Sequence, residues 1–540
     1  MKTSDAVCRS YHRIKTLVLS FSLCSSVFIF LACGSRPIDP RTVVPADSLV
    51  YLETSDLGNV VNAITSNPSF LRSAKSKPDI SSLNGIRLSI AITGFQASED
   101  QLTEENSVLN FKPGFVAVAE TNLWNYQALK FADMKLGEFV NDIYGGEVEL
   151  NTFEKLGGKY FVWTAGDGRK AYALVLGGLI LFGNDESAIE SCINVMNGGA
   201  DSIAKNPKVS AFSPDSLASG FISTDGVAQI ANLAGVALAA GAGEESEVKS
   251  FIARVLPEAV RNSVTEVVWT SRSTELGRIE DRYKVSLVPD AAKVFAETMV
   301  PGGDPDPDLS RFIPKEFNST TRYDLNDAQI AWRSVLLTVR AKTDQISGSL
   351  LTAFSSSLFE PYGIDDAETF LSAVGNTLQT VKFDADGEDV AVAARIRDIE
   401  KLKRSVAGEI NFSKSPTKFE GADIWRSEDG GLSAAIIENR IVIGEAGSVE
   451  KCLAAREKGE NLTTIAANSL ILASNAAIVT AGEDIDIEAV LVKALSEPKE
   501  NSVLQQSFVT ETRFNQNGLE RKTLSDLGLV GMIIEKIGQR

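Results

Sequence analysis

A chain of 540 residues is too long for one ordinary hydrophobic core, and a hydrophobic fraction of 44% is typical of a folded globular protein. The formal net charge of −18 argues against nucleic acid as a partner, because an acidic surface repels phosphate backbones. The single histidine, His12, lies in an N-terminal leader, so the rest of the chain cannot build a histidine-dependent catalytic triad or metal site.

Residues 1–32 have the pattern of a bacterial export signal. A basic segment leads into an uncharged apolar stretch over residues 16–32, and Cys33 follows directly. The ending Phe-Leu-Ala-Cys resembles the lipobox of bacterial lipoproteins, in which the cysteine is lipidated and becomes the mature N-terminus. We therefore expect a lipoprotein-type signal peptide over residues 1–32, lipidation of Cys33 and a tether over residues 33–43.

Two alternatives for the leader stay open. One is ordinary signal-peptide cleavage, and the other is an uncleaved single-span anchor, since residues 16–32 are just long enough to be considered for a span. All three interpretations place most of the chain outside the cytoplasm. It would lie on the periplasmic face of the inner or outer membrane, or at the cell surface.

Beyond the leader, the chain repeats itself. The stretches 160–193 and 422–453 share a tryptophan, a polar turn, a glycine, a glutamate and a cysteine in one order: Trp163 with Trp425, Gly183 with Gly444, Glu190 with Glu450, and Cys192 with Cys452. Further paired segments follow the same order along the chain: 44–64 with 313–335, 114–122 with 388–396, 217–233 with 474–491, and 266–288 with 507–527. A collinear series of this kind indicates an internal repeat.

We therefore expect an α+β fold made of two tandem copies of an antiparallel-sheet-plus-helices unit, at residues 44–300 and 311–540. The proline- and glycine-rich segment 301–310 is expected to be an exposed linker. In each copy a two-residue turn, Gly177-Gly178 or Glu438-Asn439, should close a hairpin, with glycine or asparagine taking the positive φ. A capped helix should follow each hairpin.

Few motifs point to chemistry. The acidic run 304–308 has Leu309 and Lys315 where an EF-hand loop needs a glycine and an acid, so a proline spacer is the better interpretation. The segments 202–205 and 415–418 fit Ser-x-x-Lys, without the companion motifs of penicillin-binding enzymes.

The remaining candidates also have structural interpretations. The acid-rich run 384–389 is expected to be a hairpin turn, and 482–488 a loop that enters a helix. Cys192 and Cys452 are expected to be buried packing residues, although they could pair in an oxidising compartment. The Ala/Gly-rich segment 228–243 should be a buried helix, or else the wall of an apolar cavity. No catalytic, metal-ligating or cofactor-binding residue is predicted, and no cofactor.

Three segments resemble a known family: PADSLVYLETSDLGNVVNAI at 45–64, ILFGNDESAIE at 180–190 and IAKNPKVSAF at 203–212. They are similar to the bacterial extracytoplasmic lipoprotein family catalogued as domain of unknown function 3352. The resemblance covers most of the chain after the leader. It implies export and the fold described above, and it brings no catalytic residues.

These observations predict a non-enzymatic, lipid-anchored protein that binds a partner in the cell envelope. The membrane is the expected partner of the N-terminal lipid, a protein partner is possible, nucleic acid is not expected, and any small-molecule ligand is unidentified. One alternative is a carrier or sensor of a hydrophobic, lipid-like ligand. Another is a histidine-free hydrolase that uses carboxylates or a Ser-Lys pair.

Overall fold

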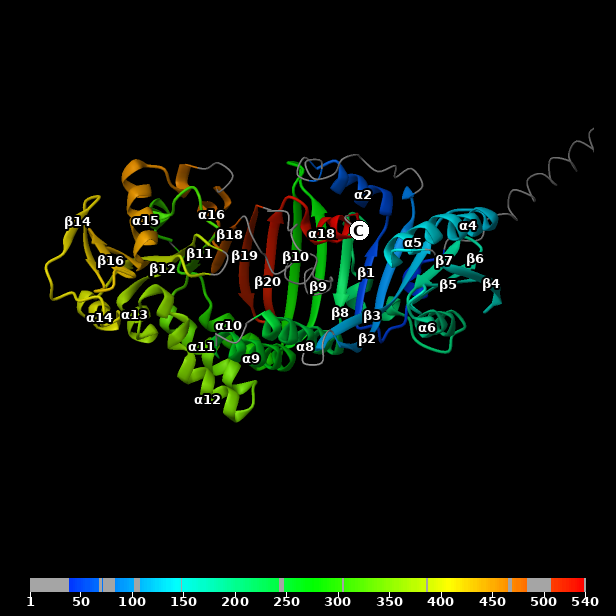
Figure 1. The fold of residues 1–540 in the computed structure, drawn as a ribbon, viewed down its shortest axis with the longest axis horizontal. Helices are drawn as coiled ribbons and strands as arrows, with labels where there is room; N and C mark the ends of the chain where they lie inside the picture. Colours follow the sequence, from blue (N-terminus) through cyan, green and yellow to red (C-terminus); the bar gives the residue numbers. More distant parts are fainter. Residues whose placement is uncertain are drawn as a thin grey trace, which may run out of the picture.

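The computed structural model describes residues 38–67, 70, 83–101, 107–146, 148–241, 247–303, 305–384, 387–464, 469–482 and 507–538. These residues form helices and one large antiparallel sheet, which runs along the length of the molecule (Figure 1). The predicted signal peptide, Cys33 and the run 483–488 lie outside the described residues.

The sheet has 20 strands, and every pair of neighbours is antiparallel. From one edge to the other the strands are β4 (Glu149–Lys155), β5 (Gly158–Thr164), β6 (Lys170–Leu176), β7 (Leu179–Gly183), β3 (Ser107–Glu120), β2 (Arg87–Gln101), β1 (Val50–Thr54), β8 (Ala218–Ile222), β9 (Val264–Ser273), β10 (Ile279–Leu287), β20 (Gly518–Ser525), β19 (Phe508–Asn515), β18 (Ile478–Gly482), β11 (Ser319–Asp324), β12 (Val374–Lys382), β13 (Val390–Ile396), β17 (Arg440–Glu445), β16 (Leu432–Ile437), β15 (Ala422–Arg426) and β14 (Thr417–Phe419).

Counted inward from each edge, the two halves of the sheet have the same strand order, and each strand number in one half is ten higher than in the other. The series β4-β5-β6-β7-β3-β2-β1-β8-β9-β10 on one side matches β14-β15-β16-β17-β13-β12-β11-β18-β19-β20 on the other. The two series meet at the antiparallel pair β10–β20, where Ile279 lies opposite Ser525 and Ser286 opposite Gly518.

Helices cover both faces of the sheet. The α-helices are α2 (Leu57–Thr65), α4 (Asn125–Phe131), α5 (Gly137–Tyr144), α6 (Glu186–Met196), α7 (Pro207–Ser210), α8 (Thr224–Gly241), α9 (Glu247–Ser263), α10 (Pro289–Thr298), α11 (Ala328–Ala341), α12 (Gln345–Phe354), α13 (Ala367–Ala373), α14 (Ile399–Ser405), α15 (Ala446–Lys458), α16 (Ser469–Ala473) and α18 (Gly528–Gly538). A π-helical turn η3 (Ala132–Leu136) joins α4 to α5, and the 3-10 helices are η1 (Pro40–Thr42), η4 (Ile203–Lys205), η5 (Pro307–Phe312), η6 (Ser356–Leu358), η7 (Glu360–Tyr362) and η8 (Leu462–Thr464).

Strand β13 is apolar from Val390 to Ala394, because both of its faces are covered over this stretch. Ala391 and Ala393 pack in a core with η5 and α15, whereas Val392 and Ala394 pack on the other face with α13 and α14. Successive side chains of a strand point to opposite faces, so a strand covered on both faces needs apolar residues at every position.

The predicted hairpins and caps are confirmed. The pairs Leu176–Leu179 and Ile437–Arg440 leave two residues in each turn, as expected. The positive φ falls on Gly177 (66°) and on Glu438 (55°), so the expectation that Asn439 would take it is wrong. The carboxylates of Asp185 and Glu445 cap the helices that follow, each accepting hydrogen bonds from backbone N–H groups of the first turn.

The segment 301–310 is not the exposed linker expected from its composition. Pro307 begins the 3-10 helix η5, whose Leu309 and Phe312 are buried in the same core as α15. The Arg440 guanidinium lies 3.2 Å from the Asp306 carboxylate and 2.8 Å from that of Asp308. Pro307 therefore fixes the φ angle at the start of a packed turn, and Asp306 and Asp308 are held by an arginine.

For the paired segments 114–122 and 388–396, the alignment by structure differs from the alignment by sequence by one residue. The matching letters Val-Ala-Val-Ala align Val116 with Val390, but Val116 lies opposite Gly183, whereas Gly444 lies opposite Ala391. Since a shift of one residue exchanges the faces of a strand, the sequence match places the wrong side chains under the following helix.

The terminal helix of each strand series packs across the β10–β20 seam. Leu527, directly before α18, is buried among Ile64 of α2 and Ile279 of β10. On the other side, α10 packs against α11, β19 and β20, and the rings of Phe295 and Phe514 are 5.9 Å apart. Each half of the sheet is thus covered partly by the helix that follows the other half's last strand.

The helix predicted over residues 228–243 corresponds to α8. It packs against α9 and β9, and Val227, Ala231 and Gly235 are buried on one side of it. Val236, on the opposite side, is 40% exposed, so the part of the helix whose burial is described, up to residue 236, is half-buried rather than buried.

Candidate polar binding cavity

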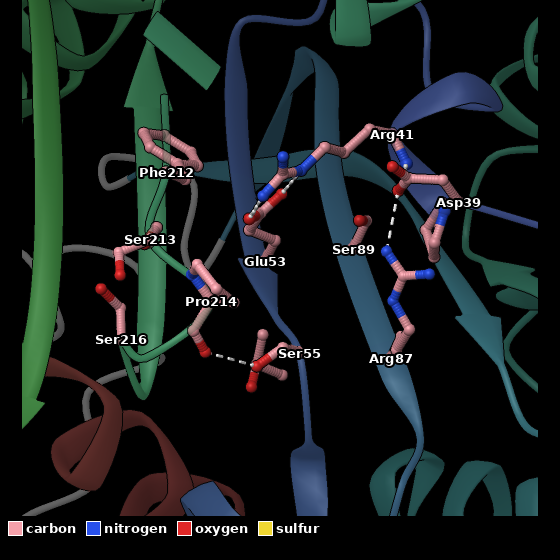
Figure 2. A pocket seen from close by; sticks show the side chains of 13 residues that line it. Asp39, Arg41, Glu53, Ser55, Arg87, Ser89, Phe212, Ser213, Pro214 and Ser216 are labelled. Carbon is pink, nitrogen blue, oxygen red and sulfur yellow. Dashed lines mark hydrogen bonds and ion pairs between the residues drawn. The ribbon is translucent and has the colours of Figure 1, made fainter. Parts of the chain in front are cut away.

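A cavity of about 390 Å³ lies between η1, β1, β2 and the loop 212–216 that precedes β8 (Figure 2). Its wall is polar and aromatic rather than aliphatic. It carries two arginines, two carboxylates, five serines and one phenylalanine: Arg41, Arg87, Asp39, Glu53, Ser55, Ser89, Ser213, Ser216, Ser219 and Phe212.

The helix η1 positions one side of this cavity. Pro40 begins η1 and is buried, and the Asp39 carboxylate accepts a hydrogen bond from the backbone N–H of Arg41 at 3.1 Å. The same carboxylate accepts from Nη2 of Arg87, on β2, at 3.1 Å. These contacts tie the first described residues of the chain to the edge of β2.

An ion pair crosses the cavity from η1 to β1. Figure 2 shows the Arg41 guanidinium facing the Glu53 carboxylate, with Nε donating to Oε2 at 2.6 Å and Nη2 paired with Oε1. The hydrogen bond and charge of Glu53 raise the pKa of Arg41. The buried Tyr51 hydroxyl donates to the same carboxylate at 2.8 Å, and burial raises the pKa of Tyr51. Glu53 is therefore held as an acceptor by two donors on its own side of the sheet.

Ser216, a residue that lines the cavity, has a hydroxyl group without a hydrogen-bond partner among the described residues. Its hydroxyl oxygen is buried. An unpaired buried hydroxyl costs roughly 1–3 kcal/mol.

At the corresponding place in the other strand series, the described polar side chains are buried and bonded to protein atoms. There the strands are β11, β12 and β18, and Arg322 of β11 is 3% exposed with its guanidinium donating to the carbonyls of Ile471 and Ser474. Ser310 of η5 donates to Gln379 Oε1 of β12 at 2.9 Å, and both side chains are buried. At the position of Glu53 this series thus carries the opposite charge, and the arginine is bonded to the segment that precedes β18.

The two cysteines behave as predicted. Cys192 and Cys452 are free and buried, the first under β3 and β7 and the second under β13 and β17. Burial raises the pKa of each thiol to about 12. Both are therefore packing groups rather than nucleophiles.

The two Ser-x-x-Lys segments do not form Ser-Lys pairs. Lys205 is ion-paired with Asp201, and Lys418 lies 2.6 Å from the Asp423 carboxylate. Both lysine side chains are largely exposed and paired with carboxylates, rather than held beside the serine as a serine acylase needs.

The described part of the acidic run 384–389 lies between β12 and β13. There the Asp384 carboxylate accepts a hydrogen bond from the backbone N–H of Gly387 at 3.0 Å. Within the ranges that the structure describes, no group of three or more histidine, cysteine or acidic side chains is placed to hold a metal ion.

Sequence reasoning missed the cavity, although one signal was present. Glu53 lies two residues after Tyr51, on the same face of a short strand, and a carboxylate there needs a partner. Arg41, its partner, was assigned to a tether with no fixed structure. Because the two residues come from segments that pair only in the fold, their contact has no local sequence signature.

No helix of the described residues is long and apolar enough to cross a membrane. The chain matches no family model, and comparisons with curated proteins and with solved structures gave no match either.

Proposed function

We propose that this protein is a lipid-anchored, extracytoplasmic binding protein whose cavity between η1, β1, β2 and loop 212–216 takes a small polar ligand. The observation that carries the proposal is the contrast between the two strand series. One has a cavity lined by Arg41, Glu53 and serines, and at the same place in the other the side chains of Arg322, Ser310 and Gln379 are buried.

The chemistry of the wall favours a zwitterionic or hydroxylated small molecule. Two arginine–carboxylate pairs present both charges, and several serine hydroxyls can donate or accept. A hydrophobic ligand would remove these charges from water without replacing their hydrogen bonds. Each carboxylate is already paired with an arginine, an arrangement suited to recognition rather than to proton transfer.

We also propose that the chain consists of two tandem copies of one unit, at residues 44–300 and 311–540. The repeated strand order supports it, as do the matching helices α6 and α15, each with a buried cysteine. On this view, duplication produced two equivalent positions, and only the first retained a cavity. Membership of the family catalogued as domain of unknown function 3352 also remains a proposal, based on the resemblance alone.

The ligand site is tested by thermal unfolding of the chain without its leader, against a panel of amino acids, dipeptides and small sugars. A ligand that binds only the folded state raises the unfolding temperature. We expect at least one panel member to do so, and Ser216→Ala to reduce this shift. In the absence of ligand, Ser216→Ala should unfold no earlier than wild type, because it removes an unpaired buried hydroxyl.

The matched control is Ser433→Ala. Ser433 lies in β16, and its hydroxyl is likewise buried without a partner among the described residues, but it does not line the cavity. This variant should keep the full ligand-induced shift. If no panel member stabilises wild type, or if both alanine variants respond equally, the cavity is not the binding site.

A further inference from the structure

The fold begins very close to the proposed lipidation site. Pro40, Val43 and Val44 are buried, and Asp39 is bonded to Arg87. The tether predicted over residues 33–43 is therefore packed from η1 onward. Ile38 comes only five residues after Cys33, and a chain of that length spans at most roughly 18 Å. A lipid on Cys33 would hold the surface around Asp39 near the membrane.

Two exposed aromatic side chains lie at this same end of the strands. Trp124 and Tyr126, at the start of α4, are 60% and 69% exposed. In the β2–β3 pair Arg87, the partner of Asp39, lies opposite Glu120, four residues before Trp124. The Asn122 side chain donates to the carbonyl of Gly85 at 3.0 Å, which holds the turn before α4 against the start of β2.

The structure also fixes how the rings are presented. The backbone N–H of Trp124 donates to Gln127 Oε1 at 3.0 Å, so the first turn of α4 is closed on itself. The charges that follow nearly cancel, with Lys130 and Lys135 against Asp133 and Glu138. Attraction to a membrane here would come from the rings rather than from charge.

We propose that Trp124 and Tyr126 lie in the headgroup region of the membrane that anchors the chain, so that the α4 end of the molecule faces the bilayer. This inference rests on the proposed lipidation of Cys33. Trp and Tyr favour this region because an apolar ring and a polar N–H or O–H are accommodated together. Since Asp39 and Arg87 line the cavity, the same orientation keeps the cavity near the membrane surface.

The test uses full-length protein purified in its lipidated form and placed in phosphatidylcholine vesicles with ordinary or brominated acyl chains. Bromine quenches tryptophan fluorescence only at short range. We expect brominated lipid to reduce the emission of wild type and to leave Trp124→Phe unchanged. Of the other four tryptophans, Trp163 and Trp269 are buried, and the half-buried Trp332 and Trp425 belong to the second strand series. All four are present in both proteins, so the difference between the two isolates Trp124.

Ile346→Trp in the Trp124→Phe background is the matched control. Ile346 is 68% exposed on α12, which lies far from α4, at the bottom of the view in Figure 1. This tryptophan should not be quenched. Equal quenching at positions 124 and 346, or no quenching at 124, overturns the proposed orientation.

The intact mass of the same preparation shows whether a negative result means that the orientation is wrong or that Cys33 is not lipidated. If Cys33 carries acyl chains and Trp124 is not quenched, the orientation is wrong and the anchor stands. If Cys33 carries no acyl chain, the anchor is wrong and the orientation is overturned with it.

Discussion

Asp281 of β10 is a carboxylate with no exposure to solvent. It accepts hydrogen bonds from Nε1 of Trp269 at 2.9 Å and from the backbone N–H of Leu529, in the first turn of α18, at 3.0 Å. Burial raises the pKa of Asp281 to about 6. One side chain thus joins β9, β10 and the C-terminal helix, at the cost of holding a buried charge at neutral pH.

The sign of the resulting pH dependence follows from linkage. Between the pKa of an unfolded aspartate, about 3.9, and the folded value, the native state binds more protons than the unfolded state. The contribution of Asp281 to stability is therefore largest below this window and is lost as the pH rises through it.

We expect the stability of Asp281→Asn, relative to wild type, to increase between pH 4 and pH 7. Urea unfolding of both proteins at several pH values measures this difference. The comparison cancels other carboxylates, such as Asp366 and Asp384, whose pKa values are lowered and which act in the opposite direction. Parallel stability curves for the two proteins would show that Asp281 does not titrate in this window.

At the scale of elements, α18 connects the end of the chain to its beginning. Leu527, directly before this helix, is fully buried among residues of α2 and β10. Leu527→Ala should destabilise the protein by about 2–5 kcal/mol, the usual range for a buried leucine. Ile533→Ala, a truncation at a 36% exposed position of α18, should cost less.

Hydrogen exchange shows where the effect of Leu527→Ala falls. Amides of α2 and β10 should lose protection, whereas those of β15 and β16, far along the sheet, should not. Uniform loss of protection along the whole sheet, or no loss at α2, would contradict a local stabilisation of α2 and β10 by Leu527.

Elements with local signals were predictable. The hairpin at Gly177-Gly178 and the cap at Asp185 follow from residues within a few positions of each other. The prediction failed where the deciding contact is distant in sequence: the register of β13 depends on β17, and the packing of η5 depends on Arg440. The cavity belongs to this second group, because Arg41 and Glu53 come from different elements and face each other only after β1, β2 and η1 have assembled.

For the whole molecule, one continuous sheet carries two series of strands with the same order and different surfaces. Cores on both faces stabilise each series, and α10 and α18 cross the seam between them. In the proposal, the first series holds the cavity and the membrane-facing end, and the second is its closed counterpart. The proposed location at the membrane and the orientation of the α4 end both depend on the anchor at Cys33.

Metabolic labelling with a fatty-acid probe, followed by membrane fractionation, tests that anchor most directly. Wild type should incorporate the probe and remain with membranes, with an intact mass that lacks residues 1–32. Cys33→Ala should incorporate none. An unlabelled wild type, a label that persists in Cys33→Ala, or a mature protein that retains its leader would contradict the account.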